Sequence, residues 1–181
     1  MKCIEELLLD KSLVSTYHHK LSEKNLIFYD TETTGILKDF SQILQCGSVL
    51  TDEGLNTLDE QNIGCAPLPW VIPQPMAMIT NKKIDLFKSN ISHYQMMKDL
   101  QMQWKQWSAE NPAIFITYNG HAFDEELVRR QFFWNLLEPY TTNTNGNGRL
   151  DLMLMIHNIA AFFLMKYLCL YLKEVLELAI S

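Results

Sequence analysis

Apolar and polar positions alternate in short blocks through most of this chain, and the blocks predict a sheet. Apolar runs bounded by turn residues predict strands at 26–29, 43–50, 57–65 and 113–118. A turn at Asp52-Glu53-Gly54 separates the second run from the third. This order predicts a meander of hairpins at the start of the sheet.

Helical periodicity predicts the elements around that sheet. We expect helices at 1–24, 92–110 and 123–137, and a last helix beginning near 149–151. Four prolines within 67–75 exclude a helix or central strand and predict an extended surface segment. Residues 160–172 are almost wholly apolar. Because this run is shorter than the roughly 20 residues that span a bilayer, it favours a buried helix over a membrane anchor.

Composition narrows the class of protein. The chain has 181 residues, of which 48% are hydrophobic and 20% charged, which indicates one folded domain and excludes a disordered chain. A net charge of −6 differs from that of a broad basic nucleic-acid-binding surface, but suits an enzyme that gathers carboxylates around metal ions. The four cysteines form no CxxC pair, which argues against a zinc knuckle. Residues 1–20 lack the apolar core of a signal peptide, so we expect a cytoplasmic protein.

Two carboxylates, Asp30 and Glu32, end the first predicted strand. Residues i and i+2 of a strand project from the same face, so this pair can share one divalent cation. Carboxylate oxygens suit Mg²⁺ or Mn²⁺, which also accept phosphate oxygens. The D-x-E pattern alone is common, and two solvated turn residues are the alternative interpretation.

A third carboxylate, Asp124, opens the helix predicted after the strand at 113–118. One interpretation is an acid that complements the helix dipole. The other is a further metal ligand, which only the fold can bring beside Asp30 and Glu32. The residues alone leave both interpretations open.

Two segments of this chain resemble the DEDD superfamily of 3′→5′ exonucleases. Residues 28–35 (FYDTETTG) resemble its first motif. The pattern Asn119-x-x-x-Phe123-Asp124, with Arg130 six residues later, resembles its second.

Longer segments narrow the resemblance to bacterial exonuclease I, over about residues 25–160. Residues 72–80 (IPQPMAMIT) and 118–140 are similar to segments of that family. Residues 149–152 (RLDL) resemble an Arg-Trp-Asp-Leu element, with Leu150 in place of Trp. Asn81 stands where that family usually has Gly.

The resemblance implies an α/β, RNase H-like exonuclease fold with a mixed central sheet flanked by helices, C-terminally incomplete. The implied activity is stepwise 3′→5′ hydrolysis of single-stranded DNA to mononucleotides, with DNA favoured over RNA. Two Mg²⁺ ions, or Mn²⁺, would activate the attacking water and stabilise the leaving oxygen. A single-stranded-DNA-binding protein is an implied partner, and no membrane is expected.

Motif position also implies the roles of individual residues. Asp30, Glu32 and Asp124 are the implied catalytic residues and metal ligands, with Asp30 bridging both ions. The implied substrate-binding residues are Thr31, Thr33, Gly35, Asn119 and Phe123. We expect Phe123 to be a core residue rather than a base-stacking one.

The last motif of the family, His-x-x-x-x-Asp on a late helix, is absent from this sequence. None of the five histidines has an Asp five residues later, and no Asp follows Asp151. We interpret Asp151 as a helix cap or orienting residue rather than a substitute ligand, and His157 as structural rather than the general base.

These observations predict a helical extension at 1–24, a partial exonuclease domain at 25–162 and an atypical apolar tail at 163–181. We hypothesise a truncated or frame-shifted form of a longer exonuclease. The chain is then either a metal-dependent exonuclease, impaired by the absent motif, or a catalytically inactive nucleic-acid-binding module or gene remnant.

Overall fold

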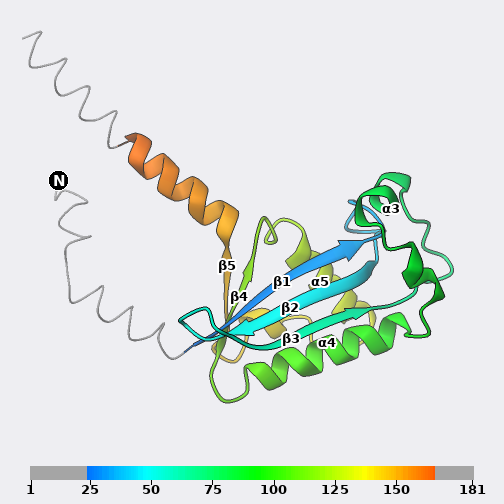
Figure 1. Cartoon of the computed structure of the whole chain (residues 1–181), viewed down its shortest axis with the longest axis horizontal. Helices are drawn as coiled ribbons and strands as arrows, with labels where there is room; N and C mark the ends of the chain where they lie inside the picture. The colour runs from blue at the N-terminus through cyan, green and yellow to red at the C-terminus, as the bar shows by residue number, and fades with distance from the viewer. Residues whose placement is uncertain (1–23, 166–181) are drawn as a thin grey trace, which may run out of the picture.

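A five-stranded sheet forms the centre of the computed structural model, which describes residues 24–165 (Figure 1). Its strands follow the order β3-β2-β1-β4-β5. They are β1 (Asn25–Thr33), β2 (Ile43–Thr51), β3 (Thr57–Gly64), β4 (Ala113–Thr117) and β5 (Gly148–Asp151). The first three pair antiparallel, whereas β4 and β5 run parallel to β1. The mixed α/β sheet and its opening meander are therefore confirmed.

The residues at the starts of two helices explain why these helices begin where they do. They are α3 (Pro75–Asn81), η1 (Ile84–Lys88), α4 (His93–Trp107), α5 (Asp124–Trp134) and η2 (Thr141–Asn143). At the start of α4, the Ser92 hydroxyl accepts a hydrogen bond from the Gln95 amide, at 3.1 Å. Pro75 opens α3, where the missing N–H costs no hydrogen bond.

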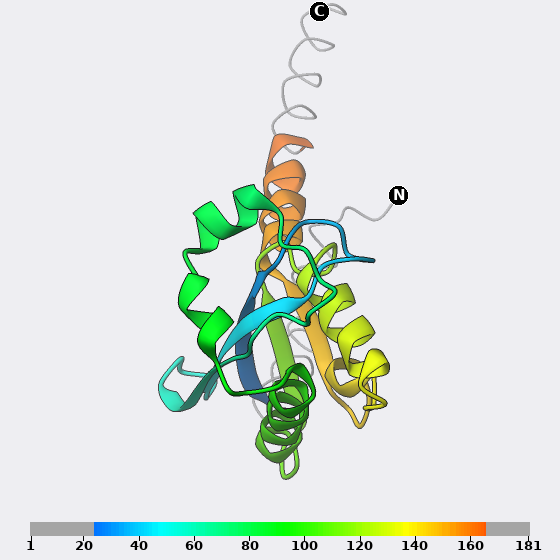
Figure 2. The ribbon, with the colours of Figure 1, turned by 90° about the vertical axis from the view of Figure 1, so that its right-hand side faces the viewer.

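One face of the sheet carries the core. Alternate side chains of β1, among them Ile27 and Tyr29, are buried against α4 and α5. Trp104 of α4 lies at the centre of this packing, with its ring 4.8 Å from Tyr29 and 6.1 Å from Phe132 of α5. Its indole N–H donates to Ser48 at 3.1 Å, so its one polar atom is satisfied. Figure 2 shows α4 and α5 beside the sheet.

The other face of β1 is less covered, and it carries the acids. Leu26, Phe28 and Glu32 are half-buried there, and Asp30 is exposed. The strand continues through Thr33, so both acids belong to the strand itself. The fold therefore separates a packed face from a face on which charge is accessible.

Three predictions are wrong in detail. Residues 149–151, expected to start a helix, belong to β5, because pairing beside β4 overrides the local pattern. The proline-rich segment is extended only as far as Gln74, since Pro75 begins α3. A last helix does follow at 152–165, but residues 160–165 are exposed rather than buried. This helix extends away from the sheet (Figures 1 and 2), so no described element packs over it.

The remaining expectations about the ends fall largely on residues 1–23 and 166–181, outside the described residues. Within 24–165, no helix has the length and hydrophobicity that crossing a membrane requires.

Two adjacent phenylalanines of α5 test the assignment of the core. Phe132 is 1% exposed and Phe133 66%. Phe132→Ala should lower the free energy of unfolding by about 3–5 kcal/mol, because it leaves a cavity beside Trp104. Phe133→Ala should change it by no more than about 0.5 kcal/mol. Urea denaturation measures both, and equal losses would contradict the core described here.

A buried histidine makes stability depend on pH. The Nε2 of His93 lies 2.6 Å from Gln131 Oε1, which also accepts from the Ile43 amide at 2.9 Å. Burial lowers the pKa of His93 below its usual 6.5, despite the hydrogen bond to Gln131, which raises it. The unfolded chain therefore binds this proton first, and stability falls as pH drops below about 6.5.

His93→Gln should remove this part of the pH dependence, and His157→Gln, at an exposed position, should not. Denaturation midpoints measured between pH 5 and pH 8 compare the two variants with the unmodified chain. An unchanged slope in His93→Gln would contradict the assignment.

Candidate active site

The parallel pairing of β1 with β4 brings the two predicted motifs to one edge of the sheet. Phe28 and Ile116 form the last pair between these strands. Beyond it, β1 continues beside β2 as far as Thr33, whereas β4 ends at Thr117 and leads into α5. Asp30 and Glu32 lie on β1, and Asp124 is the first residue of α5. Sequence positions 94 residues apart thereby become neighbours.

A direct hydrogen bond joins the motifs. The Thr31 hydroxyl donates to the Asp124 carboxylate, and both side chains are buried. Thr31 lies between Asp30 and Glu32 in sequence, but points to the opposite face of the strand. Asp124 is thus close to Asp30 and Glu32 in the fold, but its hydrogen bond is to the residue on the opposite face of the strand. Within residues 24–165, no three His, Cys, Asp or Glu side chains form a group that could hold a metal ion.

The three acids act on one another electrostatically. Burial raises the pKa of Glu32, the nearby Asp30 raises it further, and Lys83 opposes both. Burial also raises the pKa of Asp124; the Thr31 hydrogen bond opposes this, and Asp30 adds to it. Negative charge therefore accumulates here at a cost, which a bound cation would relieve.

A pocket of about 520 Å³ opens beside Glu32. It is lined by four of the five residues predicted to bind substrate: Thr31, Thr33, Gly35 and Phe123. Phe123 also packs against the core, in agreement with the prediction of a core residue. Asn119, the fifth, is exposed and does not line this pocket.

Side chains from α3 and the segment before it hold the wall of this pocket. The Gln74 amide N–H donates to Thr34 O at 2.7 Å, and Gln74 Oε1 accepts from the Ile36 amide at 3.1 Å. A side chain at Gly35 would collide with Gln74, since its Cβ would lie 2.6 Å from the Gln74 amide carbon. The Asn81 side chain donates to Thr33 O at 2.8 Å. The end of β1 is therefore tied to α3 from two directions.

Ion pairs hold the loop after β1 to α5. Lys38 and Arg130 both contact Glu126, with Arg130 Nη2 at 2.5 Å, and Arg130 also pairs with Asp39. Arg130 belongs to the second motif, so here it holds the loop that follows the first motif. These four side chains are partly or largely exposed, so the ion pairs contribute little to stability. Their effect is to fix the loop after β1 against α5.

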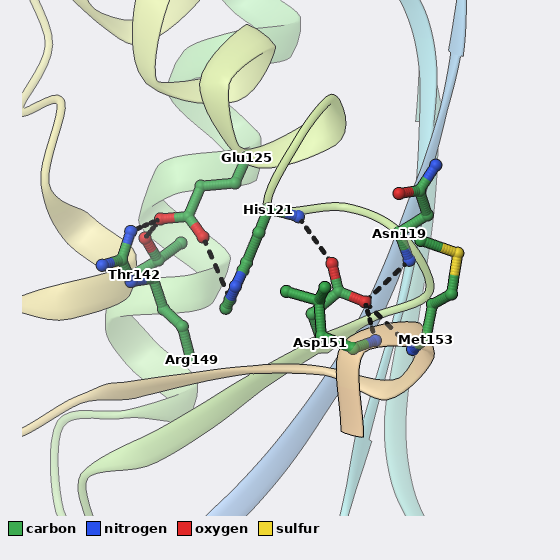
Figure 3. A network of polar contacts seen from close by, with 8 residues as sticks. Asn119, His121, Glu125, Thr142, Arg149, Asp151 and Met153 are labelled. Atoms are coloured by element: carbon green, nitrogen blue, oxygen red, sulfur yellow. Dashed lines mark hydrogen bonds and ion pairs between the residues drawn. The ribbon is translucent and has the colours of Figure 1, made fainter. Parts of the chain in front are cut away.

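The Asp151 carboxylate accepts hydrogen bonds from backbone amides of two neighbouring segments (Figure 3). Its Oδ1 accepts from the Asn119 amide at 2.9 Å and the Met153 amide at 3.0 Å, and its Oδ2 from the His121 amide at 3.1 Å. Burial tends to raise the pKa of Asp151, but these backbone donors outweigh it and hold the pKa below the usual value. The interpretation of Asp151 as a cap is confirmed, because its oxygens serve the helix at 152–165 and the turn after β4.

That turn needs unusual backbone at two positions. Asn119 has φ +60°, a conformation that Asn tolerates better than most residues. A Cβ at Gly120 would lie 2.3 Å from the Thr117 side chain, so a larger residue would displace the turn. Nearby, Glu125 accepts from Arg149 at 2.6 Å and Thr142 at 3.0 Å, which anchors the first turn of α5 (Figure 3).

The donor set fits a divalent cation in its chemistry. Asp30, Glu32 and Asp124 carry hard oxygen ligands, and burial, with a smaller contribution from Asp30, raises the pKa of Glu32 and Asp124. Asp30 and Glu32 share a strand face, whereas Asp124 is engaged by Thr31.

The sequence prediction missed the contacts by which Gln74 and Asn81 shape this site from outside the two motifs. Both residues lie within or next to the segment that resembles exonuclease I, where Asn81 replaces the usual Gly, but no local pattern predicts that they bond to residues 33–36.

The mixed sheet, with acids at the end of its first strand and at the start of the helix after β4, is the RNase H-like exonuclease fold. No family model matches the chain. It is 29% identical to exodeoxyribonuclease I of Buchnera aphidicola subsp. Schizaphis graminum over 74% of its length, and 30% identical to that of Buchnera aphidicola subsp. Acyrthosiphon pisum over 71%. A structure of Escherichia coli exonuclease I in complex with a dT13 oligonucleotide covers 71% of the chain with a TM-score of 0.64 and 22% identity.

The chain is thus related to bacterial exonuclease I over about 72% of its own length. It spans 28% and 31% of the two Buchnera relatives, and 28% of the Escherichia coli structure. The resemblance expected from the motifs is confirmed, and it concerns one part of those longer proteins.

Replacing Asp151 separates a structural role from a metal-binding one. Asp151→Ala should cost about 1–3 kcal/mol of unfolding free energy, because it removes a helix cap and leaves part-buried amides unpaired. Asp151→Asn, which keeps one acceptor oxygen, should cost less. Because backbone donors occupy both oxygens, Mn²⁺ affinity measured by titration should not change in Asp151→Asn. A loss as large as that in Asp30→Asn would identify Asp151 as a ligand.

Proposed function

We propose that this chain carries the metal-binding and terminal-nucleotide-binding part of a 3′→5′ exonuclease that hydrolyses single-stranded DNA. The observation that carries the proposal is that Glu32 lines a pocket together with Thr31, Thr33, Gly35 and Phe123. Asp124 is joined to this strand by its hydrogen bond from Thr31, and Asp30 acts on the pKa of both other acids. Acid ligands next to a small-molecule-sized cavity are what a nucleotide-processing site requires.

In this mechanism the protein binds and orients the end of the strand. The pocket seats the last nucleotide, with Phe123 as an apolar wall and the Gly35 segment, held by Gln74, as a close backbone wall. Asp30, exposed at the edge, and Glu32 direct oxygens to the phosphodiester side. Two Mg²⁺ ions, held by these acids with Asp124, would supply water activation and stabilisation of the leaving oxygen. Thr31 donates to one oxygen of Asp124, so Asp124 would hold an ion through its remaining lone pairs, directly or through water.

Related structures support the cofactor and partners proposed here. They are described as exonuclease I bound to single-stranded DNA with a zinc ion, the same complex in a metal-free form, and exonuclease I with the C-terminus of a single-stranded-DNA-binding protein. For this chain we infer a divalent cation, single-stranded DNA as substrate, with RNA less favoured, and the same kind of binding protein as a partner.

A second candidate function is an inactive nucleic-acid-binding module. It is favoured by the engagement of Asp124 with Thr31 and by the lack of a three-ligand group within 24–165. Both candidate functions use the same pocket to bind the nucleic acid. They differ in whether the phosphodiester bond is hydrolysed.

A labelled-oligonucleotide assay decides between them. The purified chain is incubated with a 3′-labelled single-stranded oligonucleotide and Mg²⁺, and released mononucleotide is measured. Asp30→Asn should lower the rate on the order of 100-fold or more, because the metal loses a ligand. The matched control is Glu53→Gln, which removes an acid from the exposed turn after β2 and should leave the rate unchanged.

Release that both variants retain equally would point to a contaminating nuclease and count against the exonuclease. Binding of the oligonucleotide without release would support the inactive module. A chain that neither binds nor cleaves would overturn both functions.

A further inference from the structure

Four separate segments line a groove of about 720 Å³ that shares no residue with the pocket beside Glu32. They are the loop after β1, the extended segment before α3, the first turn of α4 and the end of α5. Figure 1 shows α3 and the start of α4 at the end of the molecule far from the helix at 152–165. The groove is therefore a surface separate from both the acidic site and that exposed helix.

The polar side chains that line this groove are already engaged within the protein. Asp39 forms an ion pair with Arg130, and the Ser92 hydroxyl caps α4. His93 and Asn135 contact each other, with Nδ1 and Nδ2 3.3 Å apart, and both hydrogen-bond to one glutamine of α5. Among the lining residues, no carboxylate is left without a cation and no cation is left to hold a phosphate. What the groove offers to a second molecule is its apolar surface.

Five apolar side chains of the lining are 49–89% exposed: Phe40, Trp70, Ile72, Tyr94 and Trp134. Because an aromatic side chain buries about 150–250 Å² when it is fully covered, these five present on the order of 700 Å² to solvent. This exceeds the roughly 300–600 Å² of the largest apolar patch on a typical monomer. It approaches the roughly 800 Å² that each partner buries in a standard protein interface.

We infer that this groove is the interface of a symmetric dimer, with a second copy of the chain as its occupant. Trp70 and Ile72 stand largely clear of their own chain, at 75% and 89% exposed, whereas His93 in the same lining is buried. A surface that carries both a ridge and a hollow can pair with itself around a twofold axis, because each copy fills the hollow of the other. Trp70 of each copy then enters the groove of the other, as tryptophan commonly does at the centre of an interface.

The balance of charge favours a second copy over nucleic acid as the occupant. The chain carries a net charge of −6, so two copies repel each other over much of their surface. In the groove this repulsion is absent, because Arg130 offsets the charge of Asp39. Added salt screens the remaining repulsion and should leave the dimer unchanged or stronger, whereas it weakens the binding of nucleic acid.

Sedimentation velocity of the purified chain, from about 1 to 100 µM, tests the inference. We expect a dimer whose Kd Trp70→Glu raises roughly 30-fold or more, because a charge then lies in the apolar interface. Tyr94→Glu should act in the same direction. It lies in the first turn of α4, where an acid suits the helix dipole, so the fold is retained.

The matched control is Met102→Glu, at an exposed position about two turns further along α4 and outside the groove. It should leave the Kd of the dimer unchanged. Circular dichroism establishes that each variant is folded before its sedimentation is compared.

A chain that stays monomeric at about 100 µM overturns the inference. So does a dimer that both groove variants retain, and its loss in Phe162→Glu would assign the interface to the helix at 152–165 instead. A monomer that binds a dT oligonucleotide, and loses this affinity in Trp70→Glu, would identify the groove as a nucleic-acid surface. None of these results affects the exonuclease proposal, which rests on the separate pocket beside Glu32.

Discussion

Parallel pairing of β1 with β4 is the constraint on which the rest of this structure depends. It sets the ends of two distant strands side by side, and the Thr31–Asp124 hydrogen bond closes the remaining distance. Packing on one face holds this arrangement, since Trp104 touches Tyr29 of β1 and Phe132 of α5. Without that packed face, the acids on the other face would have no fixed relation to α5.

The site accumulates negative charge that the scaffold only partly offsets. Glu32 and Asp124 both have a raised pKa, caused by burial and by Asp30. Asp151 presents the opposite case, because backbone amides donate to both of its oxygens and stabilise its charge. The contrast separates Asp151, whose oxygens accept several backbone hydrogen bonds, from Asp30 and Glu32 on the accessible face of β1, while Asp124 lies between these cases because Thr31 donates to it. An acid serves binding only where its lone pairs are not already committed.

The sequence allowed the roles of two kinds of residue to be predicted, and those of a third kind could not be predicted from it. The acids, Thr33 and Gly35 belong to compact motifs whose spacing is visible on the printed chain. The helix cap at Asp151 follows from its place before an apolar helical run. Gln74 and Asn81 bond to residues 33–36 from nearly 40 to 50 residues away, and the direction of each side chain depends on how α3 docks. The strand at 148–151 was missed for a related reason, since four residues carry little propensity and their pairing with β4 decides their conformation.

By itself the sequence determined the mixed α/β architecture, the hairpin meander, the two long helices and the relation to exonuclease I, because each rests on periodicity or on motifs within a short stretch of chain. The tertiary structure alone decided which acids accept hydrogen bonds from the scaffold, that the helix at 152–165 extends away from the sheet with most of its residues exposed, and that Gln74 and Asn81 bond to the chain around the end of β1. Those features depend on contacts between segments distant in sequence. Such contacts form only when the whole sheet and its packed face come together, and no local pattern records them.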